Sequence, residues 1–508
     1  MVRISVLIIF LFGFPLHILA SLSPPQGYLI NCGSTEEKTY NDVTWIPDGD
    51  YINVGNASTI KFPNLMPMLE TLRYFPDMSA RKYCYMVPVT KGANYLVRTS
   101  YYYGGFDGGD VPPVFDQIVE GTKWSLVDTR ANYANDMATY YEVIVGATGR
   151  TLSVCLARNE NTTSSPFISA LELMRLEDSV YNATDFSMYA LSTIARHRFG
   201  YEGPMVGYPD DQFNRYWEAY TDKNSVTTSK SNTTSVEFWN LPPDAVFSTG
   251  LTTSRVENLT VQWPPMPLPP ADYYVALYFQ DDRSPSLFNW RMFDVLINGE
   301  IFYKGLNVST GGTMVYSASW PLSGLTTITL VPDVNSPIGP IINAAELLMV
   351  VPLGGRTHPR DVIGMMALAK EFNKTPPDWS GDPCLPAGNS WTGLTCSEDS
   401  LARVISLNLT NYGLGGSISE NIANLTGIKS IWLPGNYITG TIPEMGTLRQ
   451  LAFLHLENNQ LTGSIPESLG TLPKIQEIFI ENNNLDYTIP DNLKNKTGLV
   501  LQVSPGNS

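Results

Sequence analysis

The sequence contains few charged residues, few basic residues and almost no histidine. Charged residues make up 16% of its 508 residues, and 32 Lys and Arg are outnumbered by 48 Asp and Glu, which gives a net charge of −16. Such an acidic chain is a poor candidate to bind nucleic acid or an anionic membrane surface, because both would repel it. Only four histidines are present, and no metalloprotease, nucleophile-elbow, phosphate-loop or dinucleotide motif occurs. We therefore expect no catalysis, no cofactor and no bound metal.

Long apolar runs are also scarce. Residues 4–14 form one such run, followed by the small residue Ala20, which is typical of a secretory signal peptide over residues 1–20. Pro15 and His17 interrupt the run before it reaches the length of a membrane span. No other stretch approaches that length and the C-terminus has no hydrophobic tail. We expect a secreted chain in the apoplast or cell wall, with no membrane insertion of the mature protein.

Cysteine is rare, with five residues in the chain. Cys384 and Cys396 lie twelve residues apart, and we expect a disulfide bond between them that closes a short loop. Cys32, Cys84 and Cys155 then allow one further bond and leave one thiol, and the sequence alone does not choose among the pairings.

Glycosylation sequons are abundant and point to the same compartment. A single Asn-x-Ser/Thr carries little information, but ten of them behind a signal peptide favour a secreted glycoprotein. The predicted glycan acceptors are Asn56, Asn161, Asn182, Asn232, Asn258, Asn307, Asn373, Asn408, Asn424 and Asn495.

The region before residue 350 is rich in short runs of Val, Ile, Tyr, Phe and Thr, cut by Gly, Pro, Asn and Asp, which predicts β-sandwich strands. Three segments recur in one order at offsets of 178, 178 and 174 residues: 95–97 and 273–275, 115–121 and 293–299, 166–173 and 340–347. The repeat predicts two copies of one sandwich, at residues 25–176 and 200–350.

Residues 352–383 are predicted to be a linker with a short helix. A cluster of Pro and Gly ends at residue 359, and the apolar residues of 361–372 then fall near one helical face, with Asp361 as a candidate N-cap. The end of a repeat array exposes apolar core that must be shielded from water. The stretch 378–396 that follows contains two tryptophans, which we expect to pack over this end.

A strict short repeat occupies residues 384–502, including its cap. Strand leucines and isoleucines recur at spacings of 24, 23 and 24 residues, and Asn436, Asn459 and Asn483 hold the same position in successive turns. This is the plant-type leucine-rich repeat signature, and it predicts four or five solenoid turns.

The repeat geometry also assigns a candidate binding face. In each Leu-x-Leu strand the outer two residues point into the core, so the middle residue points outward. Trp432, His455 and Phe479 are therefore predicted to form an exposed aromatic column, with Glu457 and Glu481 two positions beyond the last two. Exposed aromatic residues are typical anchors for a partner. We expect this face to bind a protein or peptide, unless a glycan or the preceding module covers it.

Short motifs in a fixed order span nearly the whole chain. They are 31–33 (NCG), 72–76 (LRYFP), 84–85 (CY), 101–104 (YYYG), 166–173 (PFISALEL), 208–211 (YPDD), Trp379 and 381–384 (GDPC). The set resembles the tandem malectin-like domain and adjoining repeats of plant receptor kinases of the symbiosis-receptor type. The resemblance implies a mainly β protein: tandem malectin-like β-sandwiches followed by a short plant-type leucine-rich repeat solenoid. No kinase motif occurs, so the chain resembles a receptor ectodomain without membrane helix or kinase.

The resemblance implies a second candidate function. Animal malectin binds a glucosylated glycan through aromatic and acidic loop residues, which would correspond to Tyr101, Tyr102, Tyr103 and Asp107 here. The alternative for these residues is that the tyrosines pack in the core. The first hypothesis is a recognition protein whose partner is a cell-surface receptor or a secreted peptide or protein. The second is a carbohydrate-binding module for cell-wall or N-glycan sugars, and the third is a structural wall protein.

Overall fold

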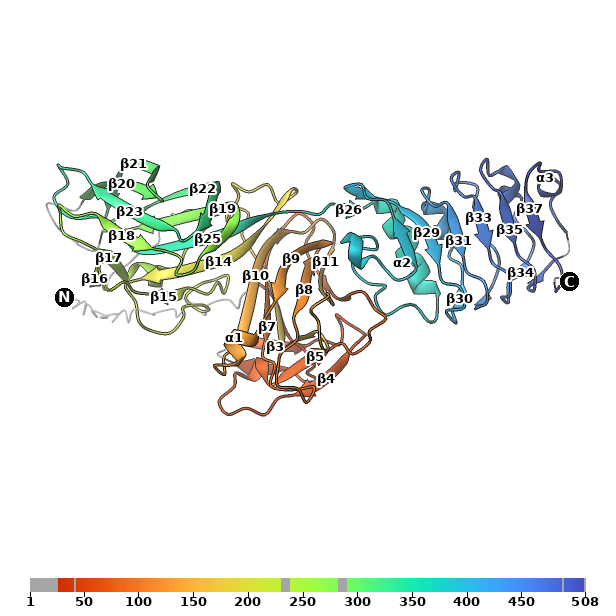
Figure 1. The fold of residues 1–508 in the computed structure, drawn as a ribbon, viewed down its shortest axis with the longest axis horizontal. Coiled ribbons are helices and arrows are strands. Elements are labelled where there is room, and N and C mark those ends of the chain that lie inside the picture. Colours follow the sequence, from red (N-terminus) through yellow and green to blue (C-terminus); the bar gives the residue numbers. More distant parts are fainter. Residues whose placement is uncertain (1–25, 41–42, 230–237, 282–289, 487, 507–508) are drawn as a thin grey trace, which may run out of the picture.

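The computed structural model describes residues 26–40, 43–229, 238–281, 290–486 and 488–506. The predicted signal peptide and the sequon at Asn232 lie outside these residues. The chain forms an elongated molecule with the second β-sandwich at one end, the first in the middle and the repeats at the other end (Figure 1). In the described residues, no helix is both long and apolar enough to cross a bilayer.

The first sandwich packs part of a large sheet against a small four-stranded sheet of order β6-β11-β8-β9. Its strands have the short β-branched and aromatic segments expected from the sequence, and their inner faces form one hydrophobic cluster. Its elements are β1 (Gly27–Asn31), β2 (Lys38–Tyr40), β3 (Val43–Pro47), β4 (Asn56–Thr59), η1 (Pro67–Leu69), β5 (Thr71–Tyr74), β6 (Tyr83–Pro88), β7 (Asn94–Tyr101), β8 (Phe115–Val119), β9 (Thr122–Val127), α1 (Arg130–Tyr133), β10 (Thr139–Gly146), β11 (Thr151–Ala157), β12 (Phe167–Ile168) and β13 (Ala170–Arg175).

The second sandwich repeats this topology. Its four-stranded sheet has the order β18-β23-β20-β21, and its part of the large sheet has the order β14-β25-β19-β22, which matches β1-β13-β7-β10 of the first copy. Its elements are β14 (Tyr189–Phe199), β15 (Glu218–Tyr220), β16 (Val226–Ser229), η2 (Asp244–Phe247), β17 (Thr249–Thr252), β18 (Leu259–Gln262), β19 (Leu268–Phe279), β20 (Trp290–Ile297), β21 (Glu300–Ser309), β22 (Thr313–Gly324), β23 (Thr327–Pro332), β24 (Ile341–Ile342) and β25 (Ala344–Pro352).

The two sandwiches share one continuous sheet. The interval between the two predicted copies contains β14, which pairs with β10 of the first copy and with β25 of the second. The result is an eleven-stranded sheet that runs through both copies. A strand in this interval therefore belongs to both units, where the sequence predicted only a boundary.

A ladder of alternating charges crosses five neighbouring strands of this sheet. Its members, in spatial order, are Glu172 on β13, Arg98 on β7, Glu142 on β10, Arg196 on β14 and Glu346 on β25. Successive ion pairs have N–O distances of 2.9, 2.8, 2.7 and 2.7 Å. All five side chains are almost fully buried. The ladder passes from one sandwich to the other. Each of its three inner members, Arg98, Glu142 and Arg196, is paired with opposite charges on both neighbouring strands.

The central carboxyl of the ladder, Glu142, makes stability depend on pH. Burial alone would raise the pKa of Glu142, but the guanidinium groups of Arg196 and Arg98 lower it to about 2. A carboxyl whose pKa is lowered by folding stabilises the native protein at every pH above the pKa of a free carboxyl. This contribution is lost as the pH falls toward 2.

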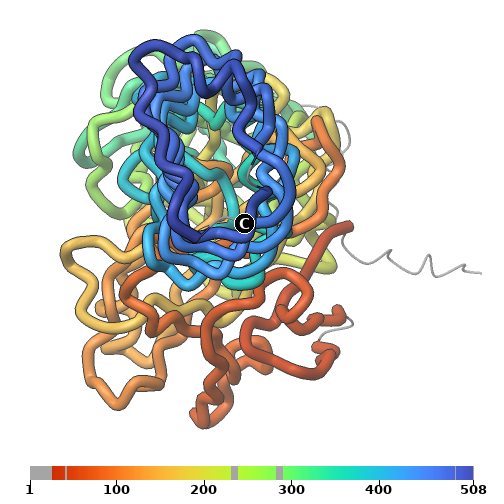
Figure 2. Tube along the Cα trace, turned by 90° about the vertical axis from the view of Figure 1, so that its right-hand side faces the viewer, coloured from red at the N-terminus to blue at the C-terminus, as the bar shows by residue number. Residues whose placement is uncertain are grey.

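The C-terminal part is a solenoid of parallel strands in the order β29-β31-β33-β35-β37, with β27 antiparallel at its start. Its stacked turns are seen end-on in Figure 2, with the first sandwich below them. The elements are β26 (Arg356–Thr357), α2 (Pro359–Glu371), η3 (Ala387–Asn389), β27 (Leu394–Cys396), β28 (Leu401–Ala402), β29 (Val404–Asn408), β30 (Gly415–Ser417), η4 (Glu420–Asn424), β31 (Ser430–Trp432), β32 (Tyr437–Thr439), β33 (Phe453–His455), β34 (Thr462–Gly463), η5 (Glu467–Thr471), β35 (Glu477–Phe479), β36 (Asn484–Leu485), α3 (Asp491–Lys494) and β37 (Val500–Gln502).

Buried asparagines join successive turns. The Asn436 amide donates to the carbonyls of Leu409 and Leu433, both at 2.9 Å, and its oxygen accepts from the Leu414 N–H. Asn459 and Asn483 make the same kind of contacts in the next turns. A buried side-chain amide thus satisfies backbone groups that the turns leave unpaired.

Helix α2 packs on the first turn of the solenoid. Met365 and Leu368 on its buried face belong to the hydrophobic core of the repeats. Its N-cap is His358, whose ring nitrogen accepts from the Arg360 N–H, and not Asp361 as the sequence suggested. Asp361 is buried, and its carboxylate pairs at 2.9 Å with Arg403, which directly precedes β29.

The cap is closed as predicted by a disulfide bond between Cys384 and Cys396. The rings of Trp379 and Trp391 stack with centroids 5.3 Å apart and join the repeat core. Their indole N–H groups donate to carbonyls within the same loop. The loop therefore covers the open end of the solenoid with a covalent closure and two large apolar rings.

The cap also docks on the first sandwich. The buried carboxylate of Asp378 accepts from the Arg81 N–H at 3.0 Å and from the Thr392 hydroxyl at 2.7 Å. The Lys82 ammonium donates to carbonyls of the cap, including that of Leu385 at 2.7 Å, and its burial lowers the pKa of Lys82 to about 8. The chain thus returns from the second sandwich and attaches the repeats to the first (Figure 1).

A second disulfide lies beneath this contact. Cys84 and Cys155 form the bond whose pairing the sequence left open, and Cys32 is a buried free thiol. Gly381 of the cap rests on this disulfide with a φ of +69°, and a Cβ there would lie 2.8 Å from the Cys84 sulfur. Any side chain at this position would force the cap away from the sandwich.

Replacing Arg196 by Met should destabilise the sandwiches by about 3–5 kcal/mol, because it removes the positive charge shared by Glu142 and Glu346 and leaves each of these buried carboxylates with one ion-pair partner fewer. Thermal and denaturant unfolding of the full chain measures the effect, with the exposed Arg150→Met as control. If the two variants unfold alike, the ladder does not hold the sandwiches together.

Replacing Asp378 by Ala should loosen the cap, since it removes the buried carboxylate that accepts from the Arg81 N–H and from the Thr392 hydroxyl, at a cost of about 1–3 kcal/mol. Hydrogen exchange at the amides of residues 378–396 should accelerate, while the exposed Asp399→Ala should leave it unchanged. Unaltered exchange in the Asp378 variant would contradict this account of the docking.

Candidate functional site

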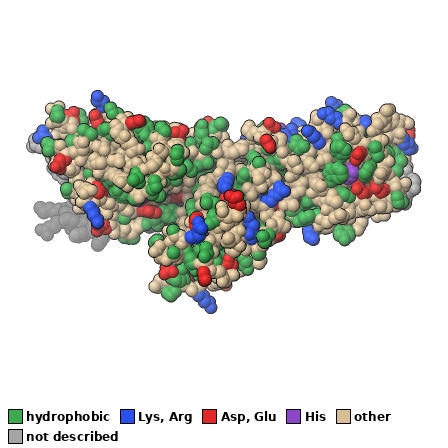
Figure 3. All heavy atoms as spheres, viewed as in Figure 1, with side chains coloured by type: hydrophobic (Ala, Val, Ile, Leu, Met, Phe, Trp, Pro, Cys, Tyr) green, Lys and Arg blue, Asp and Glu red, His purple; other side chains and the backbone are tan. Residues whose placement is uncertain are grey.

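The candidate site is the outer face of the repeat sheet, here called the repeat face. Neighbouring strands pair in parallel with their middle residues in register. These residues form one row: Asn408, Trp432, His455, Phe479 and Gln502. Acidic and hydrophobic side chains gather next to each other over the repeats (Figure 3).

The three aromatic side chains of the row contact one another with tilted rings. The ring centroids of Trp432 and His455 lie 3.9 Å apart, and those of His455 and Phe479 lie 4.3 Å apart. Phe453, on the same strand as His455, stacks on Trp432 with centroids 6.2 Å apart. The face therefore carries a continuous aromatic surface over β31, β33 and β35.

The prediction of three exposed rings is wrong for His455, which is only 4% exposed. Trp432 and Phe479 cover its two sides and remain partly exposed themselves. Carboxylates approach its edges: Glu477 Oε2 is 3.2 Å from Nε2, and Glu457 Oε1 is 3.7 Å from Nδ1. His455 thus packs between the two outer rings and offers almost no surface for a partner to contact.

The carboxylates beside the column are poorly compensated. Burial raises the pKa of Glu457, the charge of Glu481 adds to this shift, and the nearby His455 opposes it. One oxygen of Glu457 and one of Glu481 are buried without a hydrogen-bond partner among the described residues. In the described part of the chain, no Lys or Arg forms an ion pair with Glu457, Glu477 or Glu481.

Three residues of the face were missed by the sequence reasoning. Phe453 and Glu477 precede the middle position by two residues, so strand alternation places them on the same face. The same rule that selected Glu457 and Glu481 two positions later would have found them. Gln502 was missed because only four turns were aligned, whereas β37 adds a fifth strand to the sheet.

The tyrosines suggested for a sugar site lie in the core of the first sandwich. Tyr101, Tyr102 and Tyr103 are at most 2% exposed and contact other aromatic rings. Asp107 is exposed, but its carboxylate accepts from the Tyr103 hydroxyl and from the Gly109 N–H. The suggestion of a sugar site here is wrong, because none of the three rings presents a free face on which a sugar could stack.

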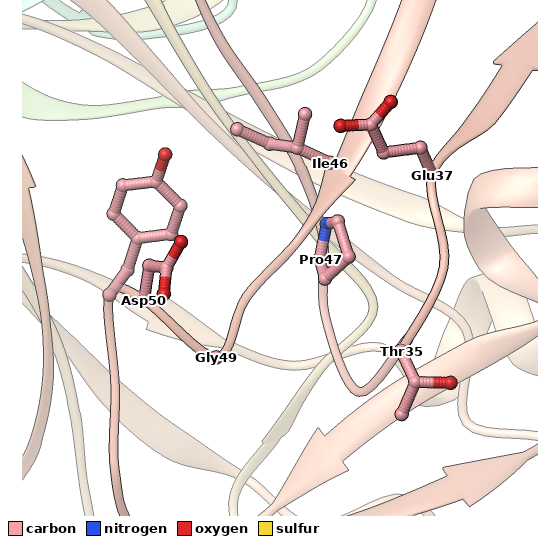
Figure 4. Close-up of a pocket in the computed structure, with 7 residues that line it drawn as sticks. Thr35, Glu37, Ile46, Pro47, Gly49 and Asp50 are labelled. Atoms are coloured by element: carbon pink, nitrogen blue, oxygen red, sulfur yellow. The ribbon is translucent and has the colours of Figure 1, made fainter.

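A separate pocket of about 430 Å³ lies at the edge of the first sandwich (Figure 4). It is lined by Thr35, Glu37, Ile46, Pro47, Gly49, Asp50 and Tyr51. Four of these residues are exposed, so the pocket is shallow. It contains none of the residues singled out from the sequence.

The sequon asparagines lie at the surface. Eight of the nine within the described residues are exposed, and Asn424 is partly exposed. Asn408 occupies the first position of the repeat face, as its sequence position implied. The described residues contain no cluster of His, Cys, Asp and Glu suited to a metal ion.

Comparison with protein families gives two matches. The family described as "Malectin-like domain" matches residues 30–350, which is more than half of the chain. The family described as "Leucine Rich Repeat" matches residues 450–472, within the solenoid.

Curated relatives of the chain include receptor kinases of Arabidopsis thaliana. A receptor-like protein kinase is 30% identical over 85% of this chain and 48% of its own length. A leucine-rich repeat receptor-like serine/threonine-protein kinase is 28% identical over 82% of this chain and 49% of its own length. The chain therefore spans about half the length of the curated relatives it matches.

Solved structures share the fold of the sandwich region. The ANX2 ectodomain from Arabidopsis thaliana superimposes with a TM-score of 0.53 at 16% identity, over 64% of this chain and 97% of that one. A chain from the crystal structure of the plant peptide RALF23 in complex with FER and LLG2 gives a TM-score of 0.52 at 18% identity, over 65% and 96%. At this identity the likeness shows the fold alone.

Replacing Glu457 by Gln should stabilise the repeats at neutral pH. Folding raises the pKa of this carboxyl, so the native state loses stability as the pH rises through the shifted range, and the neutral amide avoids that loss. The advantage should shrink as acidification protonates the wild-type carboxyl. Thermal unfolding across the acidic to neutral range tests this, with the exposed Glu444→Gln as control. A variant that is less stable than the wild type at neutral pH would contradict the assignment.

Proposed function

The chain belongs to the malectin-like domain family, and from this premise we propose that it is a non-enzymatic recognition protein that acts outside the cell. In this proposal it is secreted and glycosylated, and it binds a protein or peptide partner through the repeat face. The partner would be a cell-surface receptor or a secreted peptide or protein.

The observation that carries the proposal is the repeat face itself. Trp432 and Phe479 are partly exposed aromatic side chains whose rings both contact the buried His455 between them. An aromatic pair packed against a buried ring loses little conformational entropy on binding, which suits an anchor for a partner. Two partly exposed carboxylates beside the pair add polar groups that would orient the bound molecule.

The attachment of the repeats adds to this support. A face of five short strands is small, so a peptide that touched it alone would bind weakly. The cap holds the solenoid on the first sandwich through Asp378 and Lys82. A partner could therefore contact both modules at once without first having to order them.

The structural relatives are consistent with this class of function. One of them comes from a complex in which the plant peptide RALF23 is present with FER and LLG2. That complex is a property of those proteins, and it supports here only the proposal that a malectin-like ectodomain takes part in protein or peptide recognition. The exposed sequon asparagines and the two disulfide bonds support the proposed extracellular location.

Replacing Trp432 and Phe479 together by Ala should weaken partner binding at least 30-fold, which corresponds to the loss of about 2 kcal/mol or more at a central aromatic anchor. The assay is biolayer interferometry of glycosylated protein against a panel of plant receptor ectodomains and secreted peptides, run beside a glycan array. Tyr437→Ala is the matched control, because Tyr437 is 64% exposed and lies on β32, outside the repeat face.

The two variants separate the outcomes. Binding that is lost in the double variant and kept in Tyr437→Ala supports the proposal. Binding that is unchanged in the double variant removes the repeat face from the function. A glycan signal without any protein or peptide partner would favour the carbohydrate-binding alternative.

A further inference from the structure

We propose that the partner presents a cationic side chain, preferably arginine, that docks between Glu457 and Glu481 against the aromatic column. This inference rests on the proposed function, since it names the chemistry by which the same face recognises its partner. It commits to a peptide segment, either free or as part of a larger protein, with one basic residue at its centre.

Charge complementarity is the first argument. Glu457 and Glu481 occupy equivalent positions in adjacent turns, two residues beyond His455 and Phe479, and their charges are close enough to affect each other. In the described part of the chain, neither carboxylate has a Lys or Arg partner. A pair of like charges held side by side on a folded surface is unfavourable until a positive group lies between them.

The unpaired oxygens are the second argument. One oxygen of each carboxylate is buried without a hydrogen-bond partner among the described residues. Buried acceptors without donors are rare, because each one costs free energy. The rest of each side chain is partly exposed, so rotation of the carboxylate can bring its unpaired oxygen to a ligand. A guanidinium placed between the two carboxylates would supply donors to both at once.

The aromatic rings are the third argument. Phe479 lies in the row next to the two carboxylates, two residues before Glu481 and in register with His455, and Trp432 extends the same row. A planar guanidinium gains energy from stacking on an aromatic face and keeps its edge free for carboxylates. An ammonium forms the same ion pairs but stacks less well, which is the reason for the preference for arginine over lysine.

His455 does not serve as the missing cation. Its ring nitrogens already lie next to Glu477 and Glu457, and its two faces are covered by Trp432 and Phe479. Even a protonated imidazole would leave three carboxylates around one positive charge. The repeat face therefore keeps an excess of negative charge beside its partly exposed aromatic rings.

The experiment selects a displayed library of random heptapeptides against the full, glycosylated chain. Selected peptides should be enriched in Arg, and to a lesser degree in Lys, next to an apolar residue. Replacing that Arg by citrulline, its neutral isostere, should weaken binding at least tenfold. The double variant Glu457→Gln/Glu481→Gln should weaken the Arg peptide by a similar factor, because it removes charge while it keeps shape. Glu444→Gln, an exposed carboxylate outside the repeat face, should have no effect.

The outcomes distinguish this inference from the proposed function. Peptides that lose binding in the Trp432→Ala/Phe479→Ala variant but bind the double Gln variant as well as the wild type would overturn the cation site and leave the repeat face in place. If the selected peptides bind both double variants as tightly as the wild type, both proposals are overturned. Selection that yields no peptide dependent on the two glutamates also contradicts the inference. Circular dichroism and thermal unfolding confirm that the variants are folded.

Discussion

A buried ladder of alternating charges holds the two sandwiches together as one body. Arg98 and Arg196 each lie between two glutamates on neighbouring strands, and the shared strand β14 carries the charge that links the two copies. A buried ion-pair network contributes little net stability compared with an apolar core, but it penalises any arrangement that leaves one charge alone. The ladder therefore favours one strand order and register in the shared sheet, and this sheet fixes the positions of the two sandwiches.

The same principle operates at the junction with the repeats. Asp378 and Lys82 are buried groups whose hydrogen bonds are completed only when the cap lies on the first sandwich. Within the solenoid, buried asparagines complete the backbone bonds of adjacent turns in the same way. Polar groups that need a partner in another unit thus fix the relative position of each part. The outcome is a rigid support for one exposed aromatic surface, which is the arrangement that a recognition protein requires.

Local patterns in the sequence predicted a large part of this structure. The short repeat predicted the solenoid and its outward row because each turn repeats the same contacts with its neighbours. The predicted disulfide between Cys384 and Cys396 is present, and the matching segments 115–121 and 293–299 fall on the equivalent strands β8 and β20. The shared sheet was not predictable, because the pairing of β14 with β10 and β25 depends on contacts between strands that are distant in sequence.

The candidate sites show a similar limit. Strand alternation correctly placed Trp432, His455 and Phe479 on one face, but alternation does not say what covers that face, and here two rings cover the third. Tyr101 is the last residue of β7, and Tyr102 and Tyr103 follow it, where no simple alternation applies; all three are buried.

The most direct test of the central claim is photo-crosslinking from inside the repeat face. A benzophenone amino acid in place of Phe479 should capture the bound partner, whereas the same residue in place of Tyr437, which is exposed on β32, should not. A partner that is captured from position 437 and not from position 479 would contradict the account.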